Sequence, residues 1–332
     1  MSTFRVAPKL QKIDFLQQRA QNTLMIINYT VPGKDDGREI MRILGTEFKM
    51  SRQMIKKLKF GGTVELNGVH ATVREHVKAG DILYCEMEET CGVIKHPEEI
   101  VFRYEDEHYI VCDKPSGIVT HPTHGHLDDS LLTRLSDGTL HPVIRLDRET
   151  SGLILIAKNG YSHNTLTVCG ELNKKYLAVC YGRFDEDTGT IDAPIARREG
   201  SVMIREVTPA GKRSVTHYKT LLYDEAKNLS LVEFELETGR CHQIRVHSQY
   251  NGHPLAGDGL YGPNSNDNPS ELYPDSETID GIIGRCALHA YYLSLYDPFE
   301  KCGRVFRSPL PDDMKNLFSS PELVDEALGK IY

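Results

Sequence analysis

The segment RLDRETSGLILIA, residues 145–157, places one aspartate in a polar loop directly before an apolar run that is typical of a buried strand. Asp147 lies between Arg145 and Arg148, and nearby positive charge keeps a carboxyl group ionised. An ionised carboxylate can act as a covalent nucleophile toward a sugar carbon or an activated ring carbon. A structural ion pair in a loop is the alternative explanation of this spacing. Asp147 is therefore the first candidate for chemistry.

A second segment, LETGRCHQIRVH at residues 236–247, gathers basic side chains where a strand is expected to end. Arg240, His242 and Arg245 follow a Thr-Gly pair, and the residues after that pair are expected to enter a helix. Junctions of this kind expose backbone amides and favour anions. The glycine-rich turn GDGLYG, residues 257–262, is by itself weak evidence for any function.

The histidines and cysteines form no convincing set of metal ligands. A pattern H-x-x-H-x-H is followed by a fourth histidine, but a proline and a glycine within the pattern indicate a loop, and no cysteine lies nearby. The eight cysteines contain no C-x-x-C pair, so we expect reduced thiols and no metal site. The histidines concerned are His121, His124, His126 and His141.

The composition is that of an ordinary globular protein, with 39% hydrophobic and 26% charged residues. The 332 residues suffice for one large domain and one small one. No apolar run is long enough to span a membrane, and the first residues lack a signal pattern, so we expect a cytoplasmic protein. The net charge of -8 argues mildly against an RNA partner, although a basic surface can coexist with acidic ones.

Residues 37–90 are predicted to form a small compact unit, preceded by an extension at residues 1–36. Apolar residues at helical spacing indicate a first helix, and Ser51 can cap a second one. A strand then leads to Asn67-Gly68, which is a strong signal for a hairpin turn. These elements predict two helices and a few strands in this unit.

The second helix of this unit carries a basic face. Arg52, Lys56 and Lys59 follow at i, i+4 and i+7, and residues 49–60 contain five basic residues and no acid. A face that is merely solvated and a face that binds phosphates both explain this pattern.

The acidic stretch at residues 86–99 lacks periodicity and is interpreted as a linker. A second domain is expected at residues 97–320, where short strands and turns alternate with a few helices. Within it, SLVEFELETG alternates apolar and acidic residues, which predicts a half-buried strand. The chain is therefore predicted to be an α+β protein.

Taken together, these segments resemble the RluA family of ribosomal RNA pseudouridine synthases. The matching pattern is KPSGIVTHP, RLDRETSGL, KKYLAVCYG, TGRCHQIRVH, GHPLAGDGLYG and ALHA, in this order over roughly residues 100–300. Residues 37–90 similarly resemble the small RNA-binding module first named for a ribosomal small-subunit protein, the S-four domain. Ile144, where many members have His, and Cys241, where Thr is usual, depart from the pattern and bear on the subgroup and so on which uridine is modified.

The resemblance implies a small N-terminal αL-type RNA-binding module, followed by a catalytic domain with a mixed, largely antiparallel sheet and a cleft across it. It implies that Asp147 is the catalytic carboxylate, that Tyr176 stacks on the base and helps to move a proton at carbon 5, and that Arg245 pairs with Asp147. The carboxylate either attacks the sugar carbon or assists elimination there. No cofactor is needed, because the isomerisation involves no net redox change or group transfer.

The implied partner is RNA, specifically large-subunit ribosomal RNA, with the target base flipped out of its helix or loop. No membrane partner and no obligatory protein partner is evident. The residues expected to contact RNA are Arg52, Lys56, Lys59, Arg145, Arg148, Arg240 and His242.

Two other classes of function compete with this interpretation. A pure RNA-binding protein that has lost its chemistry is opposed by the presence of Asp147, Tyr176 and Arg245. A glycosidase-like hydrolase usually needs two catalytic carboxylates, and no second acid stands out in the matching motifs.

Overall fold

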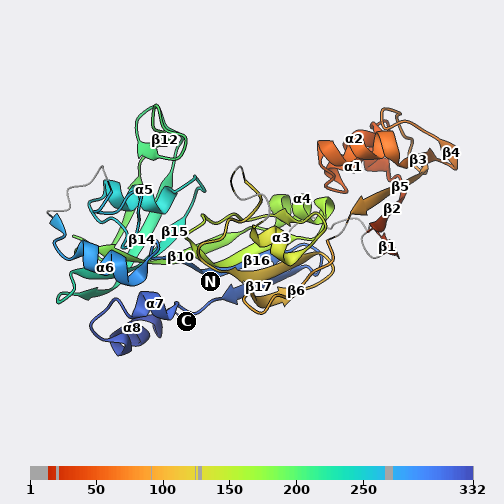
Figure 1. Cartoon of the computed structure of the whole chain (residues 1–332). Helices are drawn as coiled ribbons and strands as arrows, with labels where there is room; N and C mark the ends of the chain where they lie inside the picture. The colour runs from red at the N-terminus through yellow and green to blue at the C-terminus, as the bar shows by residue number, and fades with distance from the viewer. Residues whose placement is uncertain are drawn as a thin grey trace.

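The computed structural model describes residues 14–19, 22–90, 92–123, 125, 129–265 and 272–331. Two main sheets, one in each of two bodies, organise these residues (Figure 1). Figure 1 shows the N-terminal unit at one end of the molecule, next to helix α4 (Gly160–Cys169) of the larger domain. Within the described residues no helix has the length and apolarity required to cross a membrane.

The N-terminal unit is a five-stranded sheet in the order β1-β2-β5-β3-β4, with two helices and a short 3-10 turn. Its sheet begins before residue 37 and ends with β5 at Thr90. β2 pairs with β5 along its whole length, and its Met25 and Ile27 are buried in the core of this unit. Residues 86–90, interpreted as linker, are part of β5. The elements are β1 (Asp14–Arg19), β2 (Asn22–Thr30), η1 (Gly33–Asp35), α1 (Ile40–Thr46), α2 (Arg52–Gly61), β3 (Thr63–Leu66), β4 (Val69–His70) and β5 (Ile82–Thr90).

Local signals within this unit are confirmed. The Ser51 hydroxyl accepts a hydrogen bond from the Met54 amide at 3.2 Å and so caps α2, as the sequence predicted. Met54 and Leu58 are buried under the helix, which leaves its basic face exposed. Asn67 and Gly68 have φ angles of 54° and 76°, the left-handed conformation that a tight hairpin turn requires.

The larger domain contains a ten-stranded mixed sheet. Only the pair β9–β16 is parallel among its described strand pairs, and the others are antiparallel, which confirms a mixed, largely antiparallel sheet. The main path is β11-β14-β15-β10-β16-β9-β7-β6, with β17 on β16 and β8 on β9. The strands are β6 (Val101–Glu105), β7 (Tyr109–Lys114), β8 (His141–Pro142), β9 (Ser151–Ala157), β10 (Asn173–Tyr181), β11 (Thr188–Asp192), β14 (Val215–Asp224), β15 (Leu229–Leu236), β16 (Leu288–Asp297) and β17 (Cys302–Arg307).

The remaining elements lie around this sheet. A small two-stranded sheet is formed by β12 (Ile195–Arg197) and β13 (Arg205–Val207). The other helices are α3 (Leu131–Leu135), α5 (Gln243–Tyr250), α6 (Ser276–Ile283), α7 (Asp312–Lys315) and α8 (Pro321–Leu328). Figure 1 shows α5 at the opposite end of the molecule from the N-terminal unit.

The central strands are buried on both faces. Every residue of β9 is buried, as its apolar run predicted. β15 was expected to be half-buried, and that expectation is wrong for its first six residues. Glu233, an acidic residue in that strand, is buried because it binds Lys175 at 3.0 Å and accepts a hydrogen bond from the Tyr291 hydroxyl. Paired charges can be buried where isolated ones cannot.

Gly152 is the residue that allows β9 and β16 to run side by side directly after the Asp147 loop. Its φ is +104°, which side chains with a Cβ rarely adopt. A Cβ atom added to Gly152 would lie 2.3 Å from the carbonyl oxygen of Ala290. Neither strand can move away cheaply, because both are central in the sheet.

Replacing Gly152 therefore tests how much the close approach of β9 and β16 contributes to stability. We expect Gly152→Ala to lower the free energy of unfolding by about 2–4 kcal/mol, from strain and from overpacking against β16. Gly281→Ala is the matched control, because Gly281 lies in α6 with open space around it and the change should leave stability equal or slightly higher. Equal unfolding midpoints in urea for Gly152→Ala and the wild type would contradict this account.

Candidate active site

Asp147 lies in a loop that a second loop holds in place. The Lys114 ammonium, at the end of β7, donates hydrogen bonds to the carbonyls of Pro115, Ile118 and Arg148 at 2.7, 2.9 and 3.0 Å. The Thr120 hydroxyl donates to the Leu146 carbonyl at 2.9 Å. The two loops are thus fixed to each other on both sides of Asp147.

Lys114 itself is almost completely buried. Burial lowers its pKa to about 7, against the raising effect of Asp147. The three carbonyl acceptors match the three donors of an ammonium group, so the buried amine has no unsatisfied hydrogen. Its function is to position the loop that bears Asp147.

Arg245 provides the positive charge nearest to Asp147. Its Nη1 atom lies 3.6 Å from Asp147 Oδ2, which agrees with the pairing implied by the resemblance. Its stronger partner, however, is Asp258, which receives two parallel hydrogen bonds of 2.7 and 2.6 Å from the same guanidinium. Arg245 therefore bridges a buried carboxylate and the partly exposed Asp147.

The hydrogen bonds between Arg245 and Asp258 keep both buried groups ionised. Asp258 is fully buried and also accepts the Leu260 and Tyr261 amides at 3.0 and 3.1 Å. Burial opposes its charge, but its hydrogen bonds from Arg245 outweigh this and lower the pKa of Asp258. Burial also opposes the charge of Arg245, but its bonds to Asp258 raise the pKa of Arg245. Both groups are therefore charged at neutral pH.

The two arginines beside Asp147 in the sequence play a smaller part than expected. Arg148 donates from Nε to the carbonyl of Gly117 at 2.9 Å and lies 3.7 Å from Glu149. Arg145 is exposed at the entrance of the cleft. The ion partner of Asp147 comes from the other segment and is Arg245. His242 Nε2 lies 3.9 Å from Asp147 Oδ2, but burial lowers the pKa of His242 and so favours its neutral form.

Tyr176 lines the same cleft as Asp147. It lies in β10 between Phe234 of β15 and Ala290 of β16. Burial, and then the negative charge of Asp147, raises the pKa of Tyr176 well above its ordinary value, so its hydroxyl stays protonated. Asp147 and Tyr176 line both a small cavity of about 60 Å³ and a cleft of about 530 Å³ that adjoins it. A volume in this range accommodates a small ligand.

The candidate RNA contacts divide into two groups. Arg145, Arg240 and His242 line the small cavity beside Asp147, while Arg148 lines the adjoining cleft. The basic face of α2, with Arg52, Lys56 and Lys59, lies in the N-terminal unit and does not belong to this cleft.

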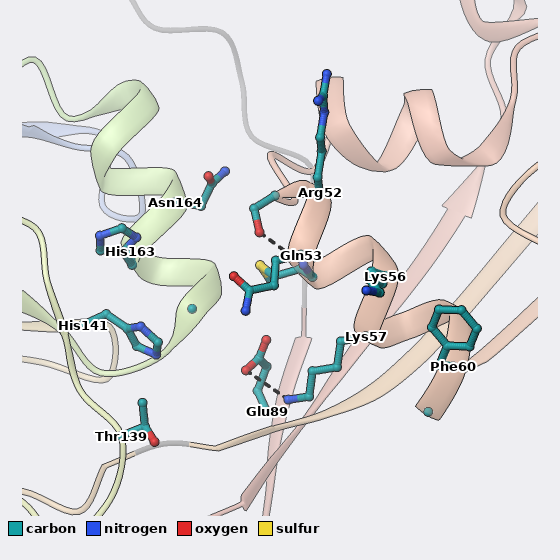
Figure 2. A pocket seen from close by; sticks show the side chains of 14 residues that line it. Arg52, Gln53, Lys56, Lys57, Phe60, Glu89, Thr139, His141, His163 and Asn164 are labelled. Carbon is teal, nitrogen blue, oxygen red and sulfur yellow. Dashed lines mark hydrogen bonds and ion pairs between the residues drawn. The ribbon is translucent and has the colours of Figure 1, made fainter.

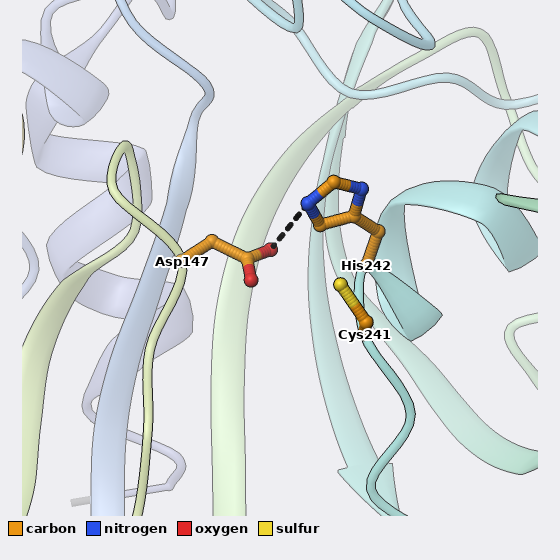
Figure 3. A group of neighbouring side chains, drawn as sticks. All are labelled: Asp147, Cys241 and His242. Carbon is orange, nitrogen blue, oxygen red and sulfur yellow. Dashed lines mark ion pairs between the residues drawn. The ribbon is translucent and has the colours of Figure 1, made fainter. Parts of the chain in front are cut away.

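One set of side chains near Asp147 has the atom types of a metal site (Figure 3). One ligand atom each from Asp147, Cys241 and His242 lies within 4.8 Å of the others. Burial and Asp147 raise the pKa of the Cys241 thiol, whereas a metal requires a thiolate. Arg245, 3.6 Å from Asp147, also repels a cation. These residues therefore do not fit a metal ion, and we assign none to them.

The histidine pattern considered from the sequence lies partly outside the described residues, because His124 and His126 fall there. His121 lines the larger cleft near Asp147. His141 lies elsewhere, in β8 against His163 of α4.

Comparisons with known proteins agree with this geometry. Residues 108–250 match the family described as RNA pseudouridylate synthase. The chain is 37% identical over 287 residues to the uncharacterized RNA pseudouridine synthase YjbO of Bacillus subtilis, an alignment that covers 82% of this chain and 95% of that protein. It is 32% identical over 323 residues to ribosomal large subunit pseudouridine synthase D of Nitrosomonas europaea, covering 91% and 89% of the two chains.

The chain belongs to the RluA family of RNA pseudouridine synthases. It is therefore an enzyme that isomerises uridine to pseudouridine in RNA. A solved structure, human RNA pseudouridylate synthase domain containing 1, has the same fold, with a TM-score of 0.52 at 23% identity over 70% of this chain and 98% of that one.

Sequence reasoning missed two residues that position the chemistry of the synthase. Asp258 stands in GDGLYG, a turn that seemed uninformative, yet its carboxylate holds Arg245. Lys114 stands in KPSGIVTHP, which contributed only to the resemblance. A signal existed for both, since a charged residue inside an apolar or glycine-rich segment is expected to need a buried partner.

Asp258→Asn tests whether this buried carboxylate positions Arg245. The amide keeps the shape but removes the charge, so a buried guanidinium loses its partner and the free energy of unfolding should fall by about 3–5 kcal/mol. We also expect turnover to fall far more than RNA affinity, because Arg245 would no longer hold Asp147.

Asp313→Asn is the matched control. Asp313 forms a similar two-point pair with Arg285, but its side chain is 40% exposed. The control should lose about 1 kcal/mol or less. Asp258 would have no positioning role if both variants had wild-type turnover in a pseudouridine assay.

Proposed function

We propose that the synthase modifies large-subunit ribosomal RNA and that Asp147 is its catalytic carboxylate. The single observation that supports the catalytic role is the position of Asp147. It is a partly exposed carboxylate that shares its cavity with Tyr176 and Arg245. The first part is supported by two relatives named ribosomal large subunit pseudouridine synthase D, from Nitrosomonas europaea and Pseudomonas aeruginosa, the latter 34% identical.

The proposed reaction needs a freed base to be held and turned. The bond between N1 of uracil and C1′ of the ribose breaks, the base rotates, and C5 bonds to C1′. The hydrogen of C5 leaves to solvent and N1 takes up a proton, so atoms and electrons balance. Asp147 either attacks C1′ or assists elimination from the sugar, while Arg245 stabilises its negative charge.

Tyr176 suits the handling of a detached base. An aromatic ring holds the faces of a base by stacking, which does not depend on the rotation of the base in its plane. Its protonated hydroxyl can pass a proton on at carbon 5. The ring is fixed by the neighbouring strands of the sheet, so its position is set before the substrate binds.

The remaining assignments concern RNA binding. We infer that Arg145, Arg148, Arg240 and His242 contact the nucleotides around the flipped uridine. The N-terminal unit serves as an S-four-type RNA-binding domain through the basic face of α2, and residues 97–320 form the catalytic domain. A cytoplasmic location is supported by the seven described cysteines, all of which are free.

Asp147→Asn tests the catalytic carboxylate. We expect no tritium release from RNA that carries tritium at carbon 5 of uridine, because the variant has lost the charge, while RNA binding is largely kept. Wild-type enzyme should release tritium to water and leave the strand intact. Glu149→Gln, in the same loop but outside the cleft, should behave as wild type.

Three results would contradict parts of this proposal. Wild-type tritium release by Asp147→Asn would remove Asp147 from the chemistry. Free uracil and an abasic site made by the wild type would indicate a hydrolase. Activity on transfer RNA only, when cellular ribosomal RNA is mapped with and without the gene, would exclude the ribosomal substrate.

Tyr176→Phe separates stacking from proton transfer. The variant keeps the ring, so it should fold and bind RNA normally, but it should lose most tritium release because the hydroxyl is absent. The measurement compares turnover and RNA affinity of the two proteins at one pH. Full release by the phenylalanine variant would leave Tyr176 with a stacking function alone.

A further inference from the structure

A large cleft of the synthase lies not at the active site but between its two bodies. It has a volume of about 1020 Å³. One wall is α2 of the N-terminal unit, and the other is formed by α4 and β8 of the catalytic domain (Figure 2). The residues that the argument uses are Arg52, Lys56, Phe60, His163 and Asn164.

The two walls are joined by specific contacts. The Asn164 side-chain amide donates a hydrogen bond to the Lys49 carbonyl, just before α2. Tyr161, from α4, is buried in the hydrophobic core of the N-terminal unit. Both bodies therefore contribute to one defined surface.

The α2 wall carries positive charge without matching acids. In the part of the chain that the structure describes, neither Arg52 nor Lys56 has a carboxylate within ion-pair distance. Other basic residues do have an acidic partner, as Lys34 has in Glu47. Lys57 does have a partner, Glu89, at 3.5 Å, so the acid within the cleft is already compensated. In a chain of net charge -8, unpaired cations on one wall indicate an anionic ligand.

Phe60 adds an aromatic ring to this charged wall. Its side chain is 73% exposed at the end of α2, and Lys59 Nζ lies 5.1 Å from the ring centre. Figure 2 shows it at the rim of the cleft, next to Lys56 and Lys57. An exposed phenylalanine among cations is the combination that binds single-stranded nucleic acid, because bases stack on the ring while cations attract the phosphates.

The opposite wall offers neutral polar groups. Burial lowers the pKa of both His141 and His163, so their rings, 5.9 Å apart, are uncharged at pH 7. Together with the amide of Asn164, they place hydrogen-bonding groups opposite the basic wall. Such groups suit base edges and 2′-hydroxyls rather than phosphates.

We propose that this cleft binds a single-stranded segment of the substrate RNA, with one unpaired base stacked on Phe60 and its phosphates along Arg52 and Lys56. The inference rests on the RNA substrate but goes beyond the active site and beyond α2 alone, because α4 supplies half of the surface. Since α2 and α5 lie at opposite ends of the molecule (Figure 1), the bound strand is remote from the target uridine. The cleft thereby selects RNAs that have an unpaired stretch at a set distance from that uridine.

The test compares full-length variants in binding a short fluorescent oligouridine and a blunt RNA duplex. Phe60→Leu should weaken oligouridine binding by roughly tenfold and duplex binding much less, whereas Phe60→Trp should restore it. An oligonucleotide containing 2-aminopurine should lose emission on binding wild type and Phe60→Trp, but not Phe60→Leu. In the double variant Arg52→Met/Lys56→Met, the logarithm of RNA affinity should fall less steeply with the logarithm of salt concentration, by about one unit of slope per lost phosphate contact.

Val69→Ala is the matched control, because Val69 is 70% exposed in the same unit but outside the cleft. It should bind and turn over RNA as wild type does. Unchanged oligouridine affinity of Phe60→Leu would overturn the proposal, as would equal losses on duplex and single strand. Tritium release by the wild type tests the proposed function separately, so the two failures are distinguishable.

Discussion

The active site depends on one buried arginine between two carboxylates. Arg245 gives its two best hydrogen bonds to Asp258 and only a longer contact, 3.6 Å, to Asp147. A guanidinium buried alone would be costly, and Asp258 removes that cost without using Asp147. Asp147 therefore gains a fixed positive neighbour without forming the main ion pair of Arg245. In the proposed mechanism, this division leaves Asp147 available for the reaction and gives Asp258 a structural role.

The sheet supplies the geometry that this ionic arrangement requires. Asp147 reaches the cleft in the loop before β9, Tyr176 lies within β10, and Arg245 lies in α5 directly after β15. β9 and β10 both flank β16, and β15 flanks β10, so the three segments meet although about 100 residues separate the first from the last. The Lys114 contacts then fix the Asp147 loop against its neighbour. Central strands buried on both faces leave little freedom for these positions to shift.

The charge distribution reconciles an acidic protein with an RNA substrate. Most acids of the described chain are exposed or paired with bases, as Asp137 is with Lys95 and Glu206 with Arg198. Positive charge without such pairing occurs at the entrance of the catalytic cleft and along α2. Because screening limits the range of charge to about 10 Å at 0.1 M salt, the net charge of -8 does not exclude RNA contact at such local surfaces.

Features that depend on neighbouring residues were predictable from the sequence: the Ser51 cap, the Asn67-Gly68 turn, the buried β9 run and, through the order of its motifs, the family. The family resemblance indicated Arg245 as the partner of Asp147, but the shorter hydrogen bonds of Arg245 are to Asp258. The pairing of Arg245 with Asp258 became visible only in the folded protein. The same holds for the burial of Glu233, the inclusion of β2 in the N-terminal unit and the cleft between α2 and α4. Each is a contact between segments far apart in the chain. Periodicity and turn signals describe only local conformation, whereas strand order and register determine which distant side chains meet.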